Sequence, residues 1–387
     1  MIKIQTTIKT KPGLKVCSNC VMDTSDPVLE FDKDGVCENC LNFFKNVKPN
    51  WPVLSNGKIK LKKIIERIKY NQKNKDFDCL LGMSGGLDSS YMLHELVTKF
   101  GLRPLVYHID AGWNSEEAVH NIQVIVQKLG LDLYTEVINW PEMRDLQLAY
   151  FKSGVPHIDS PQDIAFIAGL YHFANKTNTK YIMNGGNIST EGTRNPLSWG
   201  YYGTDMLHIR DIQKRFCTRE LKTFPFSSIL FHKIYLRYFR GVKVLKPLNY
   251  IDYNKNEAVN TLSKTYGWKP FTQKHFESRF TKFYEGYWMP TRFGIDFRKT
   301  QFSSLILTNQ MTRDDALERL RQPAFNPKTI NDEFEYIADK LNITSQELYS
   351  YHQMPLKSFR DYKNRYWMFF LGSRVLNFLG IERAIKK

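Results

Sequence analysis

The residues of this chain best suited to chemistry begin with a glycine- and serine-rich heptapeptide, SGGLDSS, at residues 84–90. The apolar run at residues 78–83 predicts a short buried strand before it, and the pattern after it predicts a helix that stops at Gly101. A tight turn from a strand into a helix directs several backbone N–H groups at one point, beside the positive end of the helix dipole. Such a cradle most often holds phosphate. The alternative is an ordinary turn that binds nothing.

Asp88 distinguishes this loop from the Walker phosphate-binding loop. The sequence lacks the Gly-Lys-Ser/Thr of the Walker loop, and the loop is too short for one. A carboxylate next to phosphates repels them unless a divalent cation bridges the two groups. Asp88 therefore predicts that Mg²⁺ accompanies the phosphates.

Four of the six cysteines form two C-x-x-C pairs, Cys17 with Cys20 and Cys37 with Cys40. Sixteen residues separate the pairs, and turn signals between them allow the chain to fold back. This spacing predicts a tetrahedral zinc ribbon with four cysteine ligands, in which the four thiolates leave no position open for substrate. The zinc is therefore expected to be structural and to supply much of the folding energy of a small region. A redox dithiol is the alternative.

The other two cysteines have different surroundings. Cys79 lies inside the apolar strand and is interpreted as a small buried hydrophobe. Cys217 lies among Lys214, Arg215 and Arg219, which would lower the pKa of its thiol and make it a weak candidate nucleophile. Neither cysteine has the setting of a glutamine-hydrolysing nucleophile.

Strand and helix patterns alternate through the middle of the chain. This alternation predicts an α/β fold with a doubly wound, mostly parallel sheet, whose ligands bind at the carboxyl ends of the strands. We expect a four-cysteine zinc ribbon at residues 1–55, an α/β domain at 56–250, and a substrate-binding, helical region at 251–387. Further strands are predicted at residues 104–110, 133–138 and 181–183. Helices are predicted at residues 58–71 and from Ser160 to about Lys176. A third helix is predicted to begin at a capping box formed by Asn114 and Glu117 and to end at Gly130.

Candidate ligand-binding residues fall at the carboxyl ends of these strands. The second strand ends in His108 and Asp110, and the loop after the fourth strand contains Gly185 and Gly186 and leads to Arg194. Paired glycines at a strand end allow a close approach of the backbone. For His108 alone, a packed or hydrogen-bonded histidine is a better interpretation than a catalytic one.

Residues 277–300 mix aromatic side chains with Arg292, Arg298 and Lys299. Aromatic rings can stack on a base, and cations can pair with a diphosphate, so the segment is a candidate for substrate binding. Capping signals at Thr329 and Thr344 predict that the last part of the chain is helical.

Residues 224–246 are also aromatic and basic. They are compatible with an interfacial membrane helix. The continuation of this segment into Pro247 favours a buried or partner-facing insertion instead.

The composition is that of a folded globular protein with a strong positive charge. The 387 residues are 42% hydrophobic and are enough for about two to three domains. The net charge of +16 favours an anionic partner, although a solvated basic surface explains it as well as a nucleic-acid interface does. No signal peptide or membrane-spanning segment is recognisable, which predicts a cytoplasmic protein.

The SGGLDSS loop resembles the signature of the PP-loop ATP pyrophosphatases, which implies an adenine-nucleotide alpha hydrolase-like domain at residues 56–250. In that group the loop holds the β- and γ-phosphates as one leaving pyrophosphate, and a substrate oxygen becomes adenylated. The resemblance implies catalytic roles for Ser84 and Asp88. It also implies nucleotide-binding roles for Ser84, Gly85, Gly86, Leu87, Asp88, Ser89, Ser90, His108, Asp110, Gly185, Gly186 and Asn187.

The whole arrangement resembles one branch of that group, the N-acetyl sugar amidotransferases of surface-polysaccharide and nonulosonic-acid biosynthesis. The resemblance extends to about residue 310. The motifs that carry it are the C-x-x-C pairs, GMSGGLDSSY, HIDAGWNS, NGGN and EGYWMPTRFGIDFRK. It implies that ATP adenylates the acetamido oxygen of a nucleotide-linked or related sugar and that ammonia then displaces AMP, leaving an acetamidino group. Arg194, Arg292, Arg298 and Lys299 are the expected substrate-binding cations.

The expected partners follow from this assignment. Because the chain shows no glutamine-hydrolysing nucleophile, a separate glutaminase subunit is expected to supply the ammonia. The main alternative is a tRNA-modifying enzyme, either a thiolase or a lysidine-type synthetase, although thiolases of this group carry extra catalytic cysteines. A non-catalytic polysaccharide-assembly subunit is a third alternative, and the intact SGGLDSS loop argues against it.

Overall fold

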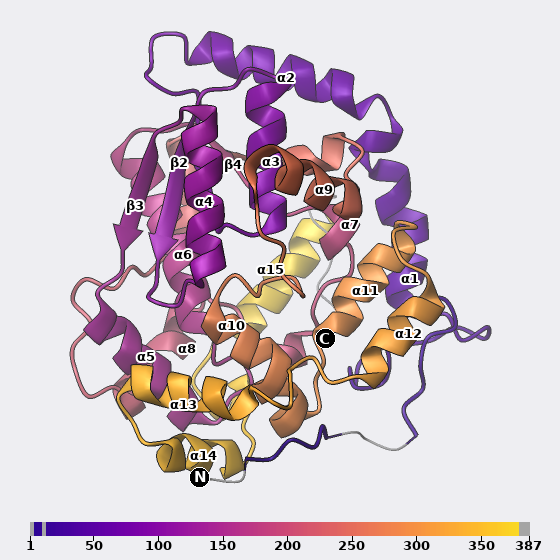
Figure 1. Ribbon diagram of the computed structural model, residues 1–387, viewed down its shortest axis with the longest axis vertical. Coiled ribbons are helices and arrows are strands. Elements are labelled where there is room, and N and C mark those ends of the chain that lie inside the picture. The colour runs from indigo at the N-terminus through magenta and orange to yellow at the C-terminus, as the bar shows by residue number, and fades with distance from the viewer. Residues whose placement is uncertain (1–3, 10–12, 379–387) are drawn as a thin grey trace.

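A five-stranded parallel sheet lies at the centre of the α/β part of the chain (Figure 1). In this computed structural model, which describes residues 4–9 and 13–378, the strand order is β3-β2-β1-β4-β5. The chain moves outward from β1 to β3, then returns to place β4 on the other side of β1, so the topological switch point lies between β1 and β4. The strands are β1 (Cys79–Gly82), β2 (Pro104–Asp110), β3 (Leu133–Val137), β4 (Tyr181–Met183) and β5 (Lys243–Leu245).

Side chains of β1 alternate between two hydrophobic cores, which confirms the doubly wound sheet. Cys79 and Leu81 belong to one core, with apolar side chains of α2, α3, α4 and α9. Leu80 belongs to the other, with side chains of α5 and α6. Both faces of the sheet are therefore covered by helices. These helices are α2 (Gly57–Asn71), α3 (Leu87–Thr98), α4 (Glu116–Leu129), α5 (Trp140–Ser153), α6 (Ser160–Lys176) and α9 (Lys255–Tyr266).

Capping signals located several helix starts to within one residue, but not every predicted cap forms. Thr329 precedes α13, and its side chain makes no capping hydrogen bond. Thr344 and Glu347 form the predicted capping box. The predicted cap of α4 is wrong by one residue, because Ser115 rather than Asn114 accepts the hydrogen bond from Ala118 N–H. Asn114 instead donates to His108. Helix α4 ends at Gly130 in the left-handed region, as its sequence predicts.

The described chain from residue 251 onward is mainly helical, as predicted. Several turns of π-helix interrupt the α-helices. In the N-terminal segment, Val21 packs with apolar side chains of α11 and α12. The remaining helices are α1 (Glu38–Asn42), α7 (Ile188–Glu191), α8 (Met206–Phe216), α10 (Arg279–Phe283), α11 (Arg298–Leu307), α12 (Arg313–Arg321), α13 (Ile330–Leu341), α14 (Ser345–Gln353) and α15 (Tyr366–Phe378), with π-helices η1 (Phe43–Val47), η5 (Leu230–Phe239) and η7 (Tyr284–Phe293) and 3₁₀ turns at Lys48–Asn50, Pro52–Leu54, Leu197–Trp199, Pro247–Tyr250 and Phe359–Asp361.

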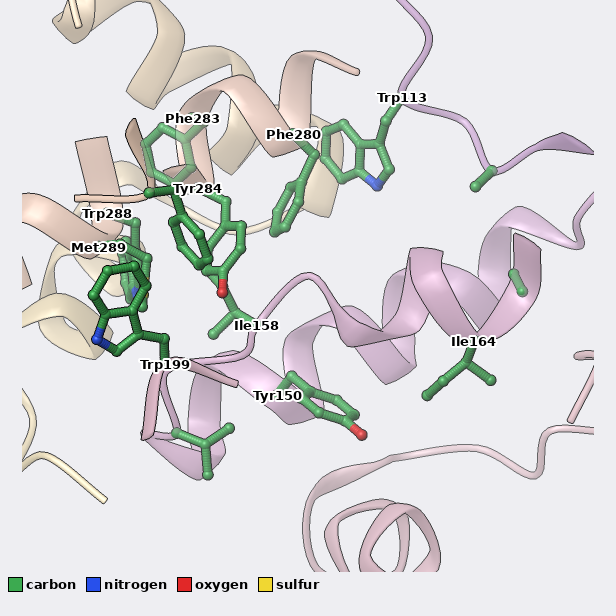
Figure 2. Packing of buried hydrophobic residues seen from close by; sticks show 14 of the residues in the cluster. Trp113, Tyr150, Ile158, Ile164, Trp199, Phe280, Phe283, Tyr284, Trp288 and Met289 are labelled. Atoms are coloured by element: carbon green, nitrogen blue, oxygen red, sulfur yellow. The ribbon is translucent and has the colours of Figure 1, made fainter. Parts of the chain in front are cut away.

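Aromatic residues of the segment 277–300 are packed in the core, so the expectation that they stack on a base is wrong for most of them. Phe280 and Trp288 are buried and make edge contacts with Phe151 of α5, at centroid separations of 5.8 and 4.8 Å. Figure 2 shows the ring of Phe280 next to Trp113, which lies three residues after the end of β2. These rings join the C-terminal helices to the carboxyl edge of the sheet.

Helix α11 links the N-terminal segment to the loop after β4. The hydroxyl of Ser303 accepts a hydrogen bond from Val21 N–H. The hydroxyl of Ser304 accepts one from Thr193 N–H, and Thr308 donates to the carbonyl oxygen of Ser189 in α7. One face of α11 thus fixes two segments that are far apart in the sequence.

Within the described ranges, none of the helices combines the length and the apolar character needed to cross a bilayer.

Candidate functional site

The loop between β1 and α3 has the geometry of an anion cradle. Gly85 lies in the left-handed region at φ 80°, and a Cβ there would approach the carbonyl oxygen of Ala118 to 2.5 Å. Only glycine fits this position. Gly86 caps α3, whose N-terminal dipole end therefore points at the loop. The hydroxyl of Ser90 is buried and has no hydrogen-bond partner among the described residues.

Asp88 accepts hydrogen bonds from three different segments. Lys274 Nζ lies 2.7 Å from its carboxylate, Thr190 Oγ1 lies 3.1 Å away, and the hydroxyl of Tyr253 donates to its other oxygen. Burial alone would raise the pKa of Asp88, but the Lys274 cation and these donors hold it below its ordinary value. Asp88 is therefore an anion beside the cradle, and carboxylate oxygen is a ligand that Mg²⁺ accepts.

Lys274 also pairs with Glu191, at 2.7 Å. The two carboxylates raise the pKa of Lys274 although its burial opposes this, so the side chain is a cation. Sequence analysis missed Lys274, Thr190 and Tyr253 as partners of Asp88. Along the chain, Thr190, Tyr253 and Lys274 lie 102, 165 and 186 residues from Asp88, and no motif in the sequence connects them to it.

The NGGN turn after β4 packs against the cradle, as the predicted close approach requires. A Cβ on Gly185 would lie 3.2 Å from the backbone nitrogen of Ser89. Asn187 then caps α7 by accepting a hydrogen bond from Thr190 N–H. This cap positions the Thr190 hydroxyl that reaches Asp88.

Glu277 extends over the cradle from the other side. Its carboxylate accepts a hydrogen bond of 3.0 Å from the Ser84 hydroxyl. A Cβ on Gly86 would lie 2.5 Å from the same carboxylate. An anion entering the cradle therefore meets a carboxylate that must move or be neutralised.

His108 is held by hydrogen bonds, in agreement with the non-catalytic interpretation of this residue. Its Nδ1 donates to the Met83 carbonyl oxygen at 2.8 Å, and its Nε2 accepts from the Asn114 amide at 2.9 Å. Burial lowers the pKa of His108, which keeps the ring neutral. Asp110 accepts a hydrogen bond from Gly112 N–H and does not line the pocket described next.

A pocket of about 560 Å³ opens beside the cradle at the carboxyl edge of the sheet. Ser84, Ser89 and His108 line one end. The carboxylates of Asp159, Asp163 and Glu285 line another part of its wall. The aromatic side chains that line the pocket are those of Phe166, Trp199, Tyr201, Tyr202, Tyr284 and Phe297. A second pocket of about 350 Å³ is lined by Lys246, Lys274, Arg194 and Glu191, and it shares His275 and Glu285 with the first. These volumes suit small-molecule ligands.

The carboxylates of the larger pocket form an acidic recess, defined here as Asp159, Asp163 and Glu285. Burial and the neighbouring Asp163 raise the pKa of Asp159 well above its ordinary value. Desolvation by the surrounding pocket wall raises the pKa of Asp163 to about 6, although part of its surface remains exposed to solvent. His275 is 3.1 Å from Glu285, and although burial opposes it, this carboxylate raises the pKa of His275 to about 9. Within the described part of the chain, the three carboxyl groups thus have one cationic neighbour, His275, and the excess of carboxyl groups favours a small cation or a proton in the recess.

Three of the four cations expected to bind substrate are engaged elsewhere. Arg292 is 1% exposed and donates to the carbonyl oxygens of His352 and Pro355. Arg298 forms a 2.7 Å ion pair with Asp296, and Lys299 forms a 2.5 Å pair with Asp23. The expectation for these three is therefore corrected, since residue type alone does not reveal an internal partner. Arg194, in contrast, is exposed and lines the smaller pocket.

The four cysteines of the two C-x-x-C pairs form a buried cluster that can hold a metal ion. Their Sγ atoms all lie within 4.8 Å of one another. Three of the six Sγ separations are 3.6 to 3.9 Å, close to the ~3.8 Å expected between thiolates at ~2.3 Å from one tetrahedral ion. Cys17 Sγ also accepts hydrogen bonds from the backbone N–H groups of Cys20 and Cys37. Arg313 of α12 donates to the carbonyl oxygens of Cys17 and Cys20.

The two cysteines outside this cluster lack reactive surroundings. Cys79 is fully buried in β1, as predicted. The expected lowering of the Cys217 pKa is wrong, because burial and the Asp145 carboxylate raise its pKa to about 12. The neighbouring cations of the sequence do not outweigh these two effects.

A comparison with protein families identifies the C-terminal part of the chain. Residues 277–374 match the model of the C-terminal domain of WbpG-like LPS biosynthesis proteins. This stretch of the chain is WbpG-like. The match supports the surface-polysaccharide family suspected from the sequence motifs. The WbpG-like region contributes Glu277 and Glu285 to the larger pocket, while the cradle belongs to the α/β domain.

Other similarities are more distant. The uncharacterized protein MJ1599 of Methanocaldococcus jannaschii is 32% identical over 120 residues, which are 30% of this chain and 40% of that protein. An NMN synthetase from Francisella tularensis aligns with 57% of this chain and 99% of its own, at 15% identity and a TM-score of 0.28. An NH3-dependent NAD synthetase from Campylobacter jejuni aligns with 77% of this chain and 98% of its own, at 16% identity and a TM-score of 0.29.

Proposed function

We propose that the protein is an ATP-dependent amidotransferase that converts the acetamido group of an N-acetylated, nucleotide-linked sugar into an acetamidino group during surface-polysaccharide biosynthesis. The observation that carries this proposal is the glycine cradle at the switch point between β1 and β4. The Asp88–Lys274 ion pair lies beside the cradle, and its Ser84 and Ser89 line a pocket large enough for a small substrate. The WbpG-like match at residues 277–374 supports the polysaccharide context.

The first half-reaction forms a good leaving group. The acetamido oxygen attacks the α-phosphorus of ATP, a P–O bond breaks, and pyrophosphate leaves, which yields an O-adenylated imidate. The N–H groups of the Ser84–Gly86 turn and the dipole of α3 would hold the departing phosphates. Mg²⁺, which the Asp88 carboxylate would hold, supplies neutralising charge for the phosphates. Lys274 lies beside Asp88 and would pair with a phosphate oxygen.

The second half-reaction replaces oxygen with nitrogen. Ammonia adds to the imidate carbon, the C–O bond to AMP breaks, and an amidine remains. The acidic recess opens into the same pocket and would attract ammonium. Asp163, whose pKa is raised to about 6, would accept a proton from it, and the free ammonia would then attack the carbon.

We further propose that a separate glutaminase subunit delivers this ammonia. Glutamine hydrolysis needs an activated nucleophile, and neither Cys79 nor Cys217 has a lowered pKa. In the division of labour that we propose, residues 1–55 hold structural zinc, 56–250 bind ATP, and 251–387 complete the substrate pocket.

One incubation tests the function directly. Purified protein with ATP, Mg²⁺, ammonium and a set of nucleotide-linked N-acetyl sugars should release AMP and pyrophosphate together, with mass spectrometry showing that NH has replaced O in one sugar. Release of ADP and phosphate would contradict the adenylation chemistry. Adenylation of tRNA in place of a sugar would support the tRNA-modifying alternative.

A companion incubation tests the source of nitrogen. With glutamine in place of ammonium, this chain alone should form no amidine and no glutamate. Glutamate formation that disappears in Cys217→Ser would contradict the two-subunit proposal and make Cys217 the nucleophile.

A further inference from the structure

A continuous part of the chain carries positive charge only. Residues 221–251 contain six lysines and arginines and no aspartate or glutamate, and they include the helix η5 and the strand β5. This charge lies in a part of the molecule that the proposed reaction does not use, except for Lys246 in the smaller pocket. Such a segment attracts anionic partners.

One side of η5 is fixed to the body of the protein. Leu236 is buried. The ring of Phe231 makes an edge contact with His172 of α6, at a centroid separation of 5.2 Å, and the ring of His232 stacks on Tyr171 of α6 at 5.3 Å. The helix is therefore a surface element with a defined orientation.

The opposite side of η5 exposes large apolar side chains. Phe239 is 78% exposed, Tyr238 68% and Leu230 63%. The rings of Tyr235 and Phe239 stack on each other at 6.3 Å and extend this surface. We call it the outer face and define it as Leu230, Ile234, Tyr235, Tyr238 and Phe239. A contiguous apolar surface of this kind marks a site of interaction.

Exposed cations lie next to the outer face. Arg237 lies in the same helix and places its guanidinium 5.5 Å from the ring centre of Tyr238. Lys243 is exposed at the start of β5 and follows Val242, whose N–H donates to the carbonyl oxygen of Leu236 in η5 at 2.8 Å. Aromatic and aliphatic side chains with arginine and lysine beside them are the composition of helices that lie in the headgroup layer of a membrane.

We propose that the outer face of η5 docks on the surface of an anionic lipid bilayer. Its apolar side chains would enter the boundary between headgroups and acyl chains, and Arg237 and Lys243 would pair with lipid phosphates. Lipid is favoured over a protein partner because the outer face combines exposed aromatic and aliphatic side chains with cations, and residues 221–251 contain no carboxylate that an anionic headgroup layer would repel. The ten residues of η5 are too few to span a bilayer, so the contact is peripheral.

Sedimentation with lipid vesicles tests this docking without any substrate. The full chain should sediment with vesicles of phosphatidylcholine and phosphatidylglycerol, and much less with phosphatidylcholine alone. Raising the salt concentration should weaken the binding because the Debye length shortens. Arg237→Gln with Lys243→Gln should lower the partition coefficient by roughly thirtyfold, since each cation near an anionic surface contributes about a factor of five.

Matched variants separate this site from the general charge of the protein. Lys62→Gln with Lys63→Gln removes two exposed cations from α2 and should leave partitioning within about twofold of wild type. Tyr238→Ser with Phe239→Ser should weaken binding, whereas Tyr70→Ser, at an exposed ring of α2, should not. The proposal is overturned if the full chain fails to sediment with the anionic vesicles. It is equally overturned if the paired α2 and η5 cation variants bind alike.

Discussion

Lys274 and Asp88 form an ion pair of 2.7 Å although 186 residues separate them in the sequence. Asp88 lies in the first turn of α3, and Lys274 lies in the loop before the WbpG-like region. Since Lys274 also contacts Glu191 of α7, one side chain joins three segments around the cradle. The charge of the proposed nucleotide site therefore depends on a residue outside the loop that identifies it.

Replacing Asp88 with Asn should remove most of the activity and keep the fold. The amide retains the shape of the side chain but loses the charge that Mg²⁺ requires, so we expect turnover to fall by about 100-fold or more. Release of pyrophosphate from ATP in the presence of the sugar measures this loss. Retention of at least half of the wild-type turnover would remove Asp88 from the proposed mechanism.

Lys274→Met should weaken both nucleotide binding and turnover. The variant leaves Asp88 and Glu191 without their shared cation, so incoming phosphates meet uncompensated carboxylates, and kcat/KM for ATP should fall by about 100-fold. Lys264→Met removes an exposed cation of α9 and serves as the control. Equal effects of the two substitutions would show that only the overall charge matters.

The two glycines of the cradle should differ in their tolerance of a methyl group. Gly85→Ala forces a positive φ and a clash with the Ala118 backbone, which should lower the free energy of unfolding by about 2 kcal/mol or more and abolish ATP binding. Gly86 has an ordinary φ of −74°, and its Cβ would meet only the flexible carboxylate of Glu277. Gly86→Ala should therefore be milder, and Glu277→Ala should relieve its defect. Chemical denaturation and nucleotide titration compare the four proteins.

The His275–Glu285 ion pair should make stability depend on pH in the alkaline range. The pKa of His275 rises from 6.5 to about 9 on folding, so its contribution is complete below pH 6.5 and disappears as the pH rises through 9. Because the His275 side chain is partly exposed, we expect His275→Gln to cost only about 1 kcal/mol below pH 6.5 and nothing above 9. His120→Gln is the matched control. A loss for His275→Gln that is independent of pH would contradict the assignment.

Removal of the metal should destabilise the protein before it affects the chemistry of the pocket. The purified protein should contain about one zinc ion per chain, and Cys17→Ser should lower the free energy of unfolding by about 3 kcal/mol or more. Cys217→Ser should leave the zinc content unchanged. Metal analysis and thermal unfolding test both statements, and a metal-free protein of full stability would contradict them.

Local sequence patterns predicted four of the strands and the cradle because each depends on neighbouring residues. Strand β5 escaped detection because it has three residues, two of them exposed, within a basic stretch. The hydrogen-bond partners of Asp88 were not predicted because they are distant in the sequence and come together only in the folded protein. Arg292 and Arg298 were misassigned because residue type does not distinguish an arginine that binds substrate from one that donates to a backbone carbonyl oxygen inside the protein.

The hydrogen bonds of α11 have a consequence for the protein in its cell. Arg313 of α12 donates to the backbone of the cysteine cluster, and Ser303 of α11 accepts a hydrogen bond from Val21 next to it. Helix α11 also binds the Thr193 backbone, in the segment whose Thr190 contacts Asp88. A chain that folds under zinc starvation would thus lose the support of its nucleotide site together with its metal. Under the function proposed above, the sugar modification would then fall with the zinc supply, even while ATP, sugar and ammonia remain abundant.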